Sequence, residues 1–259
     1  MIENESSESN SLDEFIGGKI SLFQPLNGYR VNTDSILLAA AIDAKKGQRV
    51  LELGCGVGAV LYALMSRIDG LNVVGIEAQK QYAELAALNA GHNGFKASIV
   101  ECDIFEVPNI YKNLHYDHVV LNPPFFNSTG SMELKGVGKN LAKREQKLTL
   151  DDWIDVAIRR CCCKGEVVLI HKAERLAQIM KCVDKRLGDI KILPISSFRG
   201  EHAKKIIVKG KKGSLSPLTI LAPLVMHKDR QSDDSGAKYT AKAEEILRMG
   251  KKVDWFKQN

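Results

Sequence analysis

The stretch LELGCGVGAV, from Leu51 to Val60, decides the fold of this 259-residue chain. A short apolar run with strand character ends in glycines at alternate positions, and a helical pattern follows at once. Glycine permits the positive φ angles of tight turns and lets a ligand approach the backbone closely. A strand, a glycine loop and a helix in this order are typical of open α/β sheets, which bind ligands beyond the carboxyl ends of their strands.

Short apolar runs and helical patterns alternate along the rest of the chain. The predicted strands are residues 49–54, 72–77, 97–103, 116–121, 165–171, 190–196 and 203–210. The predicted helices are residues 58–68, 80–94, 150–162, 173–187 and 239–250. Such alternation predicts an α/β fold whose mostly parallel sheet is covered by helices on both faces. A short loop without a helix joins the last two strands, so we expect an antiparallel strand at one edge.

The two ends of the chain suggest its organisation. Residues 1–14 are acidic and rich in serine, which predicts a disordered tail. Residues 15–259 are long enough for a single domain, made of a lead-in over residues 15–47, the alternating region and a closing C-terminal helix. No obligate protein partner is evident from the sequence.

Cysteine usage and hydropathy bear on the compartment. The six cysteines show no paired spacing with histidine or cysteine that is typical of zinc sites, so we expect free thiols and no metal. No apolar run is long enough to span a bilayer, and the N-terminus lacks the basic start and apolar core of a secretory signal. We therefore expect a cytoplasmic protein without a membrane partner.

The net charge of +6 is unevenly distributed. Positive side chains concentrate in SFRGEHAKKIIVKGKKG, residues 197–213. A basic cluster of this kind is usually a solvated face, but it also suits phosphate groups, because neutralising them releases counterions. The cluster leaves both interpretations open.

Acidic residues stand at the ends of the first three predicted strands. Glu52 precedes the glycine loop, where a carboxylate suits a cationic amino-acid ligand better than the pyrophosphate that a dinucleotide places at a helix N-terminus. Glu77 ends the second strand, where an acid hydrogen-bonds ribose hydroxyls. Asp103 ends the third strand and is placed to meet an adenine amino group. The alternative is three unrelated surface acids.

The sequence NPPF, residues 122–125, follows the fourth predicted strand. Two prolines end a buried strand, since they cannot donate to its ladder. The motif therefore holds an amide side chain and an aromatic ring at the strand end. An ordinary turn after a buried strand is the alternative.

Together LELGCGVG, GIE, CDIF and NPPF resemble the S-adenosylmethionine-dependent methyltransferases of the seven-stranded Rossmann-like class. That class has an antiparallel seventh strand. The resemblance implies that S-adenosylmethionine is the cofactor and that the glycine loop holds its methionine part. The cofactor residues implied in this way, with those argued above, are Glu52, Gly54, Gly56, Gly58, Glu77, Asp103, Ile104, which packs on the adenine ring, and Asn122.

The NPPF motif implies a flat amino nitrogen as methyl acceptor, whose lone pair is delocalised and therefore weakly nucleophilic. The side-chain oxygen of Asn122 and the backbone carbonyl of Pro123 are expected to hold the two amino hydrogens and free the lone pair. The locked φ angles of Pro123 and Pro124 fix that carbonyl, and Phe125 stacks on the acceptor ring. Catalysis is then mainly positioning. The acceptor is adenine N6, guanine N2 or a glutamine amide.

The lead-in LFQPLNGYRVNTDSILLAAAI, residues 22–42, resembles that of the bacterial tRNA(Val) adenine-N6 methyltransferase family. KREQKLTLDDW and YTAKAEEIL resemble the same family. In it a Thr-Asp pair, here Thr33 and Asp34, helps to close the cofactor site, although either residue also suits a helix N-cap.

From these resemblances we expect an enzyme that methylates adenine N6 in the anticodon region of tRNA, where bases splay out at low cost. The residues expected to hold RNA phosphates are Lys135, Lys139, Lys143, Arg144, Arg199, Lys204 and Lys205. The alternatives are a guanine-N2 RNA methyltransferase, a protein glutamine methyltransferase, a cofactor-binding or RNA-binding module without turnover, and a nicotinamide dehydrogenase.

Overall fold

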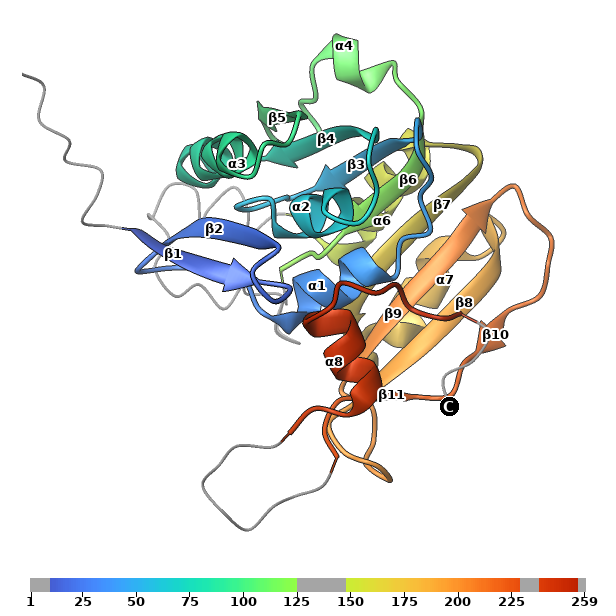
Figure 1. Cartoon of the computed structure of the whole chain (residues 1–259). Helices are drawn as coiled ribbons and strands as arrows, with labels where there is room; N and C mark the ends of the chain where they lie inside the picture. Colours follow the sequence, from blue (N-terminus) through green and yellow to red (C-terminus); the bar gives the residue numbers. More distant parts are fainter. Residues whose placement is uncertain (1–9, 125–147, 229–237, 256–259) are drawn as a thin grey trace, which may run out of the picture.

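A computed structural model describes residues 10–124, 148–228 and 238–255, which build one large mixed sheet with helices on both faces (Figure 1). The strand order is β10-β8-β9-β7-β6-β3-β4-β5, and β11 also pairs with β8. The strands are β3 (Arg49–Leu53), β4 (Asn72–Glu77), β5 (Ala97–Glu101), β6 (Tyr116–Leu121), β7 (Cys161–Lys172), β8 (Leu187–Ser196), β9 (Lys205–Lys212), β10 (Thr219–Ile220) and β11 (Leu224–Val225).

The mostly parallel sheet with an antiparallel strand is confirmed. Strands β5, β4, β3, β6 and β7 run parallel to one another, and β9 runs antiparallel to both β7 and β8. The antiparallel strand lies inside the sheet rather than at its border. The side chains of Ile206, Ile207 and Val208 are buried, as suits a strand with neighbours on both sides.

Helices cover both faces of this sheet, as predicted. They are α1 (Thr33–Ala40), α2 (Ala59–Met65), α3 (Lys80–His92), α4 (Asn109–Lys112), α6 (Leu150–Arg160), the 3-10 helix η1 (Ala173–Arg175), α7 (Leu176–Val183) and α8 (Ala241–Leu247). Figure 1 shows α1, α2 and α8 across one face and α6 and α7 behind the other. Alternate residues of β6 feed two separate cores: Val120 packs with α1 and α2, whereas Val119 and Leu121 pack with α6.

A hairpin of β1 (Asn10–Phe15) and β2 (Ile20–Pro25) precedes the sheet. The prediction of disorder up to residue 14 is therefore wrong for residues 10–14, which pair with β2 because an antiparallel partner supplies their backbone hydrogen bonds. Residues 1–9 lie outside the described part. The division of the chain into a lead-in, one domain and a closing helix stays a prediction.

Two predicted boundaries are corrected. The helix expected over residues 150–162 ends at Arg160, because Cys161 takes an extended conformation and opens β7. The helix expected over residues 173–187 ends at Val183, and β8 begins at Leu187, earlier than predicted. Among the helices described, none combines the length and apolar character needed to cross a bilayer.

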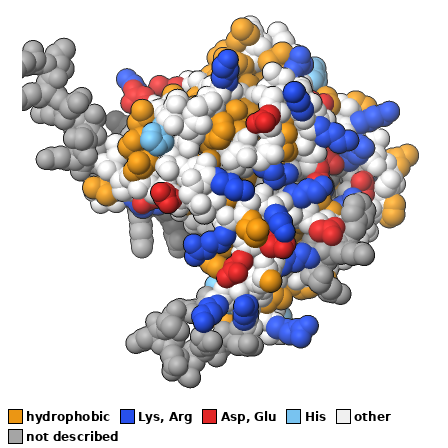
Figure 2. Space-filling model, viewed as in Figure 1, with side chains coloured by type: hydrophobic (Ala, Val, Ile, Leu, Met, Phe, Trp, Pro, Cys, Tyr) orange, Lys and Arg blue, Asp and Glu red, His pale blue; other side chains and the backbone are white. Residues whose placement is uncertain are grey.

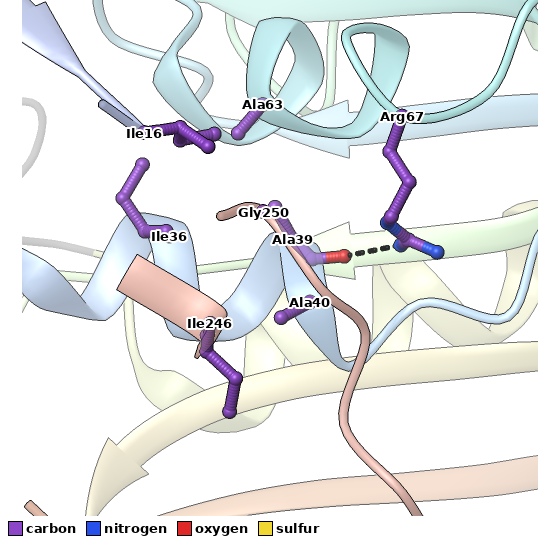
Figure 3. Close-up of a pocket in the computed structure, with 8 residues that line it drawn as sticks. All are labelled: Ile16, Ile36, Ala39, Ala40, Ala63, Arg67, Ile246 and Gly250. Atoms are coloured by element: carbon purple, nitrogen blue, oxygen red, sulfur yellow. Dashed lines mark hydrogen bonds between the residues drawn. The ribbon is translucent and has the colours of Figure 1, made fainter. Parts of the chain in front are cut away.

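A small pocket lies between the hairpin turn, α1, α2 and α8, away from the carboxyl ends of the strands (Figure 3). Its one charged lining residue, Arg67, donates hydrogen bonds to the carbonyls of Ala39 and Ile42 at 3.0 and 2.9 Å, and so caps the end of α1. Since its remaining lining is mostly apolar, we interpret this pocket as a small gap between packed elements rather than a ligand-binding site.

Candidate active site

Sheet register brings the predicted site residues to one edge. Leu53 of β3 pairs with Ile76 of β4 on one side and with Leu121 of β6 on the other. The residues that follow these strands, including Gly54 and Asn122, therefore stand side by side. Glu77 pairs with Glu101 of β5, so Asp103 follows at the same edge. The predicted residues thus come together as an ordered row across β6, β3, β4 and β5.

The three loop glycines meet different requirements. Gly54, Gly56 and Gly58 all have positive φ, at 68°, 54° and 87°. A Cβ on Gly54 would lie 2.7 Å from Trp153, and one on Gly58 would lie 2.1 Å from the Tyr62 ring. A Cβ on Gly56 would meet no atom within 4 Å, so this backbone faces open space. Gly56 is the loop position that leaves room for a ligand.

Glu77 ties the glycine loop to β4. The residue is 7% exposed; its Oε2 accepts a hydrogen bond from the Gly56 N–H at 2.8 Å, and its Oε1 accepts one from the Gln79 N–H at 2.9 Å. Burial raises the pKa of Glu77, while these backbone donors oppose the rise. Each carboxylate oxygen has lone-pair capacity left for a ligand hydroxyl.

Glu52 is a buried carboxylate with an unsatisfied oxygen. It is 1% exposed, and its Oε2 has no hydrogen-bond partner among the described residues. Burial raises the pKa of Glu52 well above its usual range, and the charge of Glu77 raises it further, while a backbone hydrogen bond from Leu61 opposes the rise. A buried carboxylate oxygen without a partner is costly unless a ligand satisfies it. The residues present therefore fit the ammonium group of S-adenosylmethionine.

The lead-in reaches this edge through α1. Asp34 is 1% exposed, and both of its carboxylate oxygens accept hydrogen bonds from Lys205 Nζ, at 2.6 and 2.7 Å. The expected N-cap role of Thr33 or Asp34 is wrong, because Asn32 caps α1 by accepting from the Asp34 N–H at 2.8 Å. Lys205, expected to hold phosphate, is instead engaged by Asp34.

Tyr29 lies near the same carboxylates. Burial of its hydroxyl raises the pKa of Tyr29; the charges of Asp34 and Glu52 add to the rise, and a hydrogen bond with Ser35 opposes it. The Tyr29 backbone N–H donates to the Tyr82 hydroxyl at 2.8 Å, which fixes this segment against α3. Residues 29–35 therefore border the Glu52 side of the site.

The acceptor side of the row is partly described. Asn122 and Pro124 are half-buried and Pro123 is buried, directly after β6. Phe125 lies outside the described residues, as do the loop cations Lys135, Lys139, Lys143 and Arg144. At the other end, Asp103 Oδ1 accepts from the Phe105 N–H at 2.9 Å. Ile104 is 4% exposed and belongs to the apolar core beside β4.

Trp153 and Tyr29 border the site and were not predicted, and Lys205 was predicted to hold phosphate rather than to pair with Asp34. Trp153, on α6, presses its indole against Gly54, is 8% exposed, and has no partner for its Nε1 within the described part. The tryptophan in LTLDDW is visible in the sequence, but no local signal indicates that it packs on Gly54. Nothing local in the sequence indicated that Lys205 would reach Asp34, 171 positions away.

Comparisons with known proteins agree with this geometry. The family model described as "Methyltransferase small domain" matches residues 28–151. The tRNA1(Val) (adenine(37)-N6)-methyltransferase of Porphyromonas gingivalis is 32% identical over 179 residues, which cover 64% of this chain and 69% of that protein.

Solved structures show the same fold. A predicted O-methyltransferase from Agrobacterium tumefaciens aligns with a TM-score of 0.66 at 24% identity, over 85% of this chain and 98% of its own. M. jannaschii TYW2, solved in complex with AdoMet, aligns with a TM-score of 0.54 at 13% identity, over 80% and 88%. This chain is therefore an S-adenosylmethionine-dependent methyltransferase and belongs to the same family as the P. gingivalis enzyme.

Proposed function

We propose that this enzyme transfers a methyl group from S-adenosylmethionine to the N6 amine of an adenine in the anticodon region of tRNA. The observation that carries the proposal is the position of Asn122 and Pro123, which follow β6 directly beside the glycine loop of β3. The names of the relatives support a tRNA adenine as acceptor.

The proposed chemistry needs two hydrogen-bond acceptors and no strong base, because the methylated nitrogen is left positively charged and gives its extra proton to water. The Asn122 side-chain oxygen and the Pro123 carbonyl each accept one hydrogen of the flat amino group, which frees the nitrogen lone pair. Pro123 and Pro124 keep this carbonyl fixed, because their φ angles are locked. Phe125 supplies the stacking surface for the base. Positioning and electrostatic stabilisation then provide most of the rate.

The proposed cofactor contacts follow the row of strand ends. S-adenosylmethionine supplies the activated methyl group when bound. The residues proposed to contact the cofactor are Glu52 for its ammonium group, Gly54, Gly56 and Gly58 for its methionine part, Glu77 for its ribose, Asp103 and Ile104 for its adenine, and Thr33, Asp34 and Asn122 around its reacting end. The orphaned Glu52 oxygen and the open space at Gly56 support the first two assignments.

The test is methyl transfer from labelled cofactor to total tRNA, followed by mass spectrometry of the nucleosides. We expect N6-methyladenosine from the natural enzyme and a loss of at least about 100-fold in rate for Asn122→Ala, as for removal of one transition-state contact. Asn109→Ala, at an exposed asparagine of α4, is the control. Full activity of Asn122→Ala would refute the mechanism, and N2-methylguanosine or RNase-resistant label would refute the acceptor.

A further inference from the structure

Three aromatic rings stack at the start of the β8–β9 connection. The ring of His227 lies 5.5 Å from that of Phe198, tilted by 37°, and 5.0 Å from that of Tyr239, nearly parallel at 18°. All three side chains are partly exposed. Partly exposed aromatic rings next to cations are the combination that single-stranded nucleic acids bind.

Backbone hydrogen bonds hold these rings on a fixed support. The His227 N–H donates to the Ser197 carbonyl at 2.9 Å, and the Lys228 N–H donates to the Lys238 carbonyl at 3.0 Å. His227 and Tyr239 also form an antiparallel bridge. We call residues 197–204, 226–228 and 238–240 together the edge platform. Its side chains project from backbone segments that hydrogen-bond to one another.

The edge platform is strongly basic. Its exposed cationic side chains are Arg199, Lys204, Lys228 and Lys238, together with the titratable His202. None of the four permanent cations has an ion-pair partner within the part of the chain that is described. Glu201 is the only acidic residue of the platform. Figure 2 shows Lys and Arg side chains gathered at the corresponding lower end of the molecule.

Three of the four lysines of β9 differ from the platform cations, because the structure engages their ammonium groups. Lys205 is engaged by Asp34, Lys209 is buried and paired with Asp43 at 2.6 Å, and Lys212 donates to two backbone carbonyls of the α6–β7 junction. The basic segment seen in the sequence therefore divides into structural lysines within the strand and available cations on the platform. Like charges held together without acidic ion-pair partners among the described residues favour a polyanion as the occupant.

The edge platform lies at the catalytic edge of the sheet. Leu121 of β6 pairs with Leu169 of β7, and Lys205 at the start of β9 pairs with Lys172 of β7 and with Ile195 of β8. The platform begins just beyond Ile195, at the same edge as Asn122. Three strand spacings, roughly 14 Å, separate β6 from β8, and the platform begins three residues, roughly 10 Å, further along the strands than Leu121. An RNA strand that extends a few nucleotides from a base at Asn122 is long enough to reach it.

We propose that the edge platform binds the sugar-phosphate backbone of the RNA substrate beside the base to be methylated. Arg199, Lys204, Lys228 and Lys238 contact phosphates, and the aromatic rings accept an unpaired neighbouring base. This inference rests on the proposed function, because it takes RNA as the substrate. An acidic protein on the same surface is the competing outcome.

The test compares two variants that lose the same charge. The platform variant carries Arg199→Gln, Lys204→Gln, Lys228→Gln and Lys238→Gln. The control variant carries Lys45→Gln, Lys46→Gln, Lys96→Gln and Lys112→Gln, at exposed lysines that precede β3, β5 and β6 at the opposite edge. Dissociation constants for tRNA at several salt concentrations, and for S-adenosylmethionine, are measured for each.

We expect the platform variant to bind tRNA at least about 10-fold more weakly and to lose about 3 from the slope of log K against log salt, since each single-strand phosphate contact contributes about 0.7. Its dissociation constant for S-adenosylmethionine is the same as that of the natural enzyme, and the control variant binds tRNA as tightly as the natural enzyme. Equal tRNA binding by both variants overturns the inference. So does platform-dependent binding of acidic proteins alone.

Failure of the proposed function gives a different result. In that case the natural enzyme transfers no methyl group to tRNA, whatever the platform binds. If the natural enzyme methylates tRNA and the platform variant retains its salt slope, only the platform inference fails.

Discussion

At the scale of single residues, we expect Glu52 to lower the stability of the cofactor-free protein and to strengthen cofactor binding. Because burial raises its pKa, the folded state disfavours the charged carboxylate. Above the ordinary glutamate pKa, ionisation of Glu52 therefore lowers the free energy of unfolding; this cost disappears at lower pH, where both states are protonated. Glu52→Gln is expected to raise the melting temperature of the cofactor-free protein at pH 7 and not at pH 4. Calorimetry at the two pH values checks this.

The same substitution is expected to weaken cofactor binding by about 10- to 150-fold, the worth of a hydrogen bond to a charged group at about 1.5–3 kcal/mol. Titration calorimetry with S-adenosylmethionine in buffers of different ionisation enthalpy measures both affinity and proton release. We expect the natural protein to release a proton on binding and the variant to release less. Glu84→Gln, at an exposed glutamate 65% accessible at its side chain, is the matched control. Natural affinity in Glu52→Gln would contradict the assignment.

Asp34 and Lys205 form the second residue-scale prediction. Lys205→Met leaves a carboxylate that is 1% exposed without its partner, which costs about 3 kcal/mol of unfolding free energy. Asp34→Asn combined with Lys205→Met is expected to recover most of this loss, because no buried charge then remains. Urea denaturation measures both, with the exposed neighbour Lys204→Met as control. Equal losses in the single and double variants would show that the pair is not coupled.

At the scale of elements, asparagine side chains of α3 and its C-cap hydrogen-bond the backbone of β2 at the edge where β2 has no neighbouring strand in the described part of the chain. Asn89 Oδ1 accepts from the Phe23 N–H at 2.7 Å, and its Nδ2 donates to the carbonyls of Phe23 at 3.1 Å and Val57 at 3.0 Å. Asn93 repeats the pattern at Ser21, one turn further along the helix. Two asparagine side chains therefore satisfy the outer edge of β2 and link the hairpin to the glycine loop.

Asn89→Ala is expected to cost about 2–4 kcal/mol, because the buried Val57 carbonyl and two partly buried backbone groups of Phe23 lose their partner. Asn93→Ala, nearer the surface, costs less. Hydrogen exchange should show faster exchange of the Phe23 amide in the first variant and of the Ser21 amide in the second. Unchanged protection at Phe23 would exclude this role for α3.

At the scale of the whole molecule, the C-terminal segment fastens α1 to the sheet. The Val253 N–H donates to the Ala40 carbonyl at 2.8 Å, and Trp255 Nε1 donates to the Ala41 carbonyl at 3.2 Å. Lys209 Nζ of β9 lies 4.1 Å from the centre of the Trp255 ring. Residues more than 200 positions apart thus close one face of the molecule.

Trp255→Ala is expected to lose about 3–5 kcal/mol of stability, from the cavity left by a side chain that is 4% exposed. At about 2–4 °C per kcal/mol for a chain of this size, the melting temperature falls by roughly 10 °C. Thermal unfolding checks this against Met249→Ala, an exposed residue of the same region. A fall no larger than that of the control would mean that the segment contributes little.

The sequence by itself determined the seven main strands and the alternating helices from residue 49 onward, together with the residues at the strand ends; it did not reveal the β1–β2 hairpin, α4 or the short strands β10 and β11. Apolar periodicity and glycine are local signals, and parallel strands end at one edge, so Gly54, Glu77 and Asn122 were predictable as neighbours. The limits of β4 and β6 agree with the prediction to the residue.

The tertiary structure alone decided which distant side chains meet. It placed Trp153 on Gly54, Lys205 on Asp34 and Asn89 on β2, and it put β9 between β7 and β8. It also separated the paired lysines of β9, Lys205 and Lys209, from the exposed cations of the edge platform. The physical reason is that local patterns fix conformation and burial, whereas a side chain's partner is chosen by close packing between elements far apart in the chain.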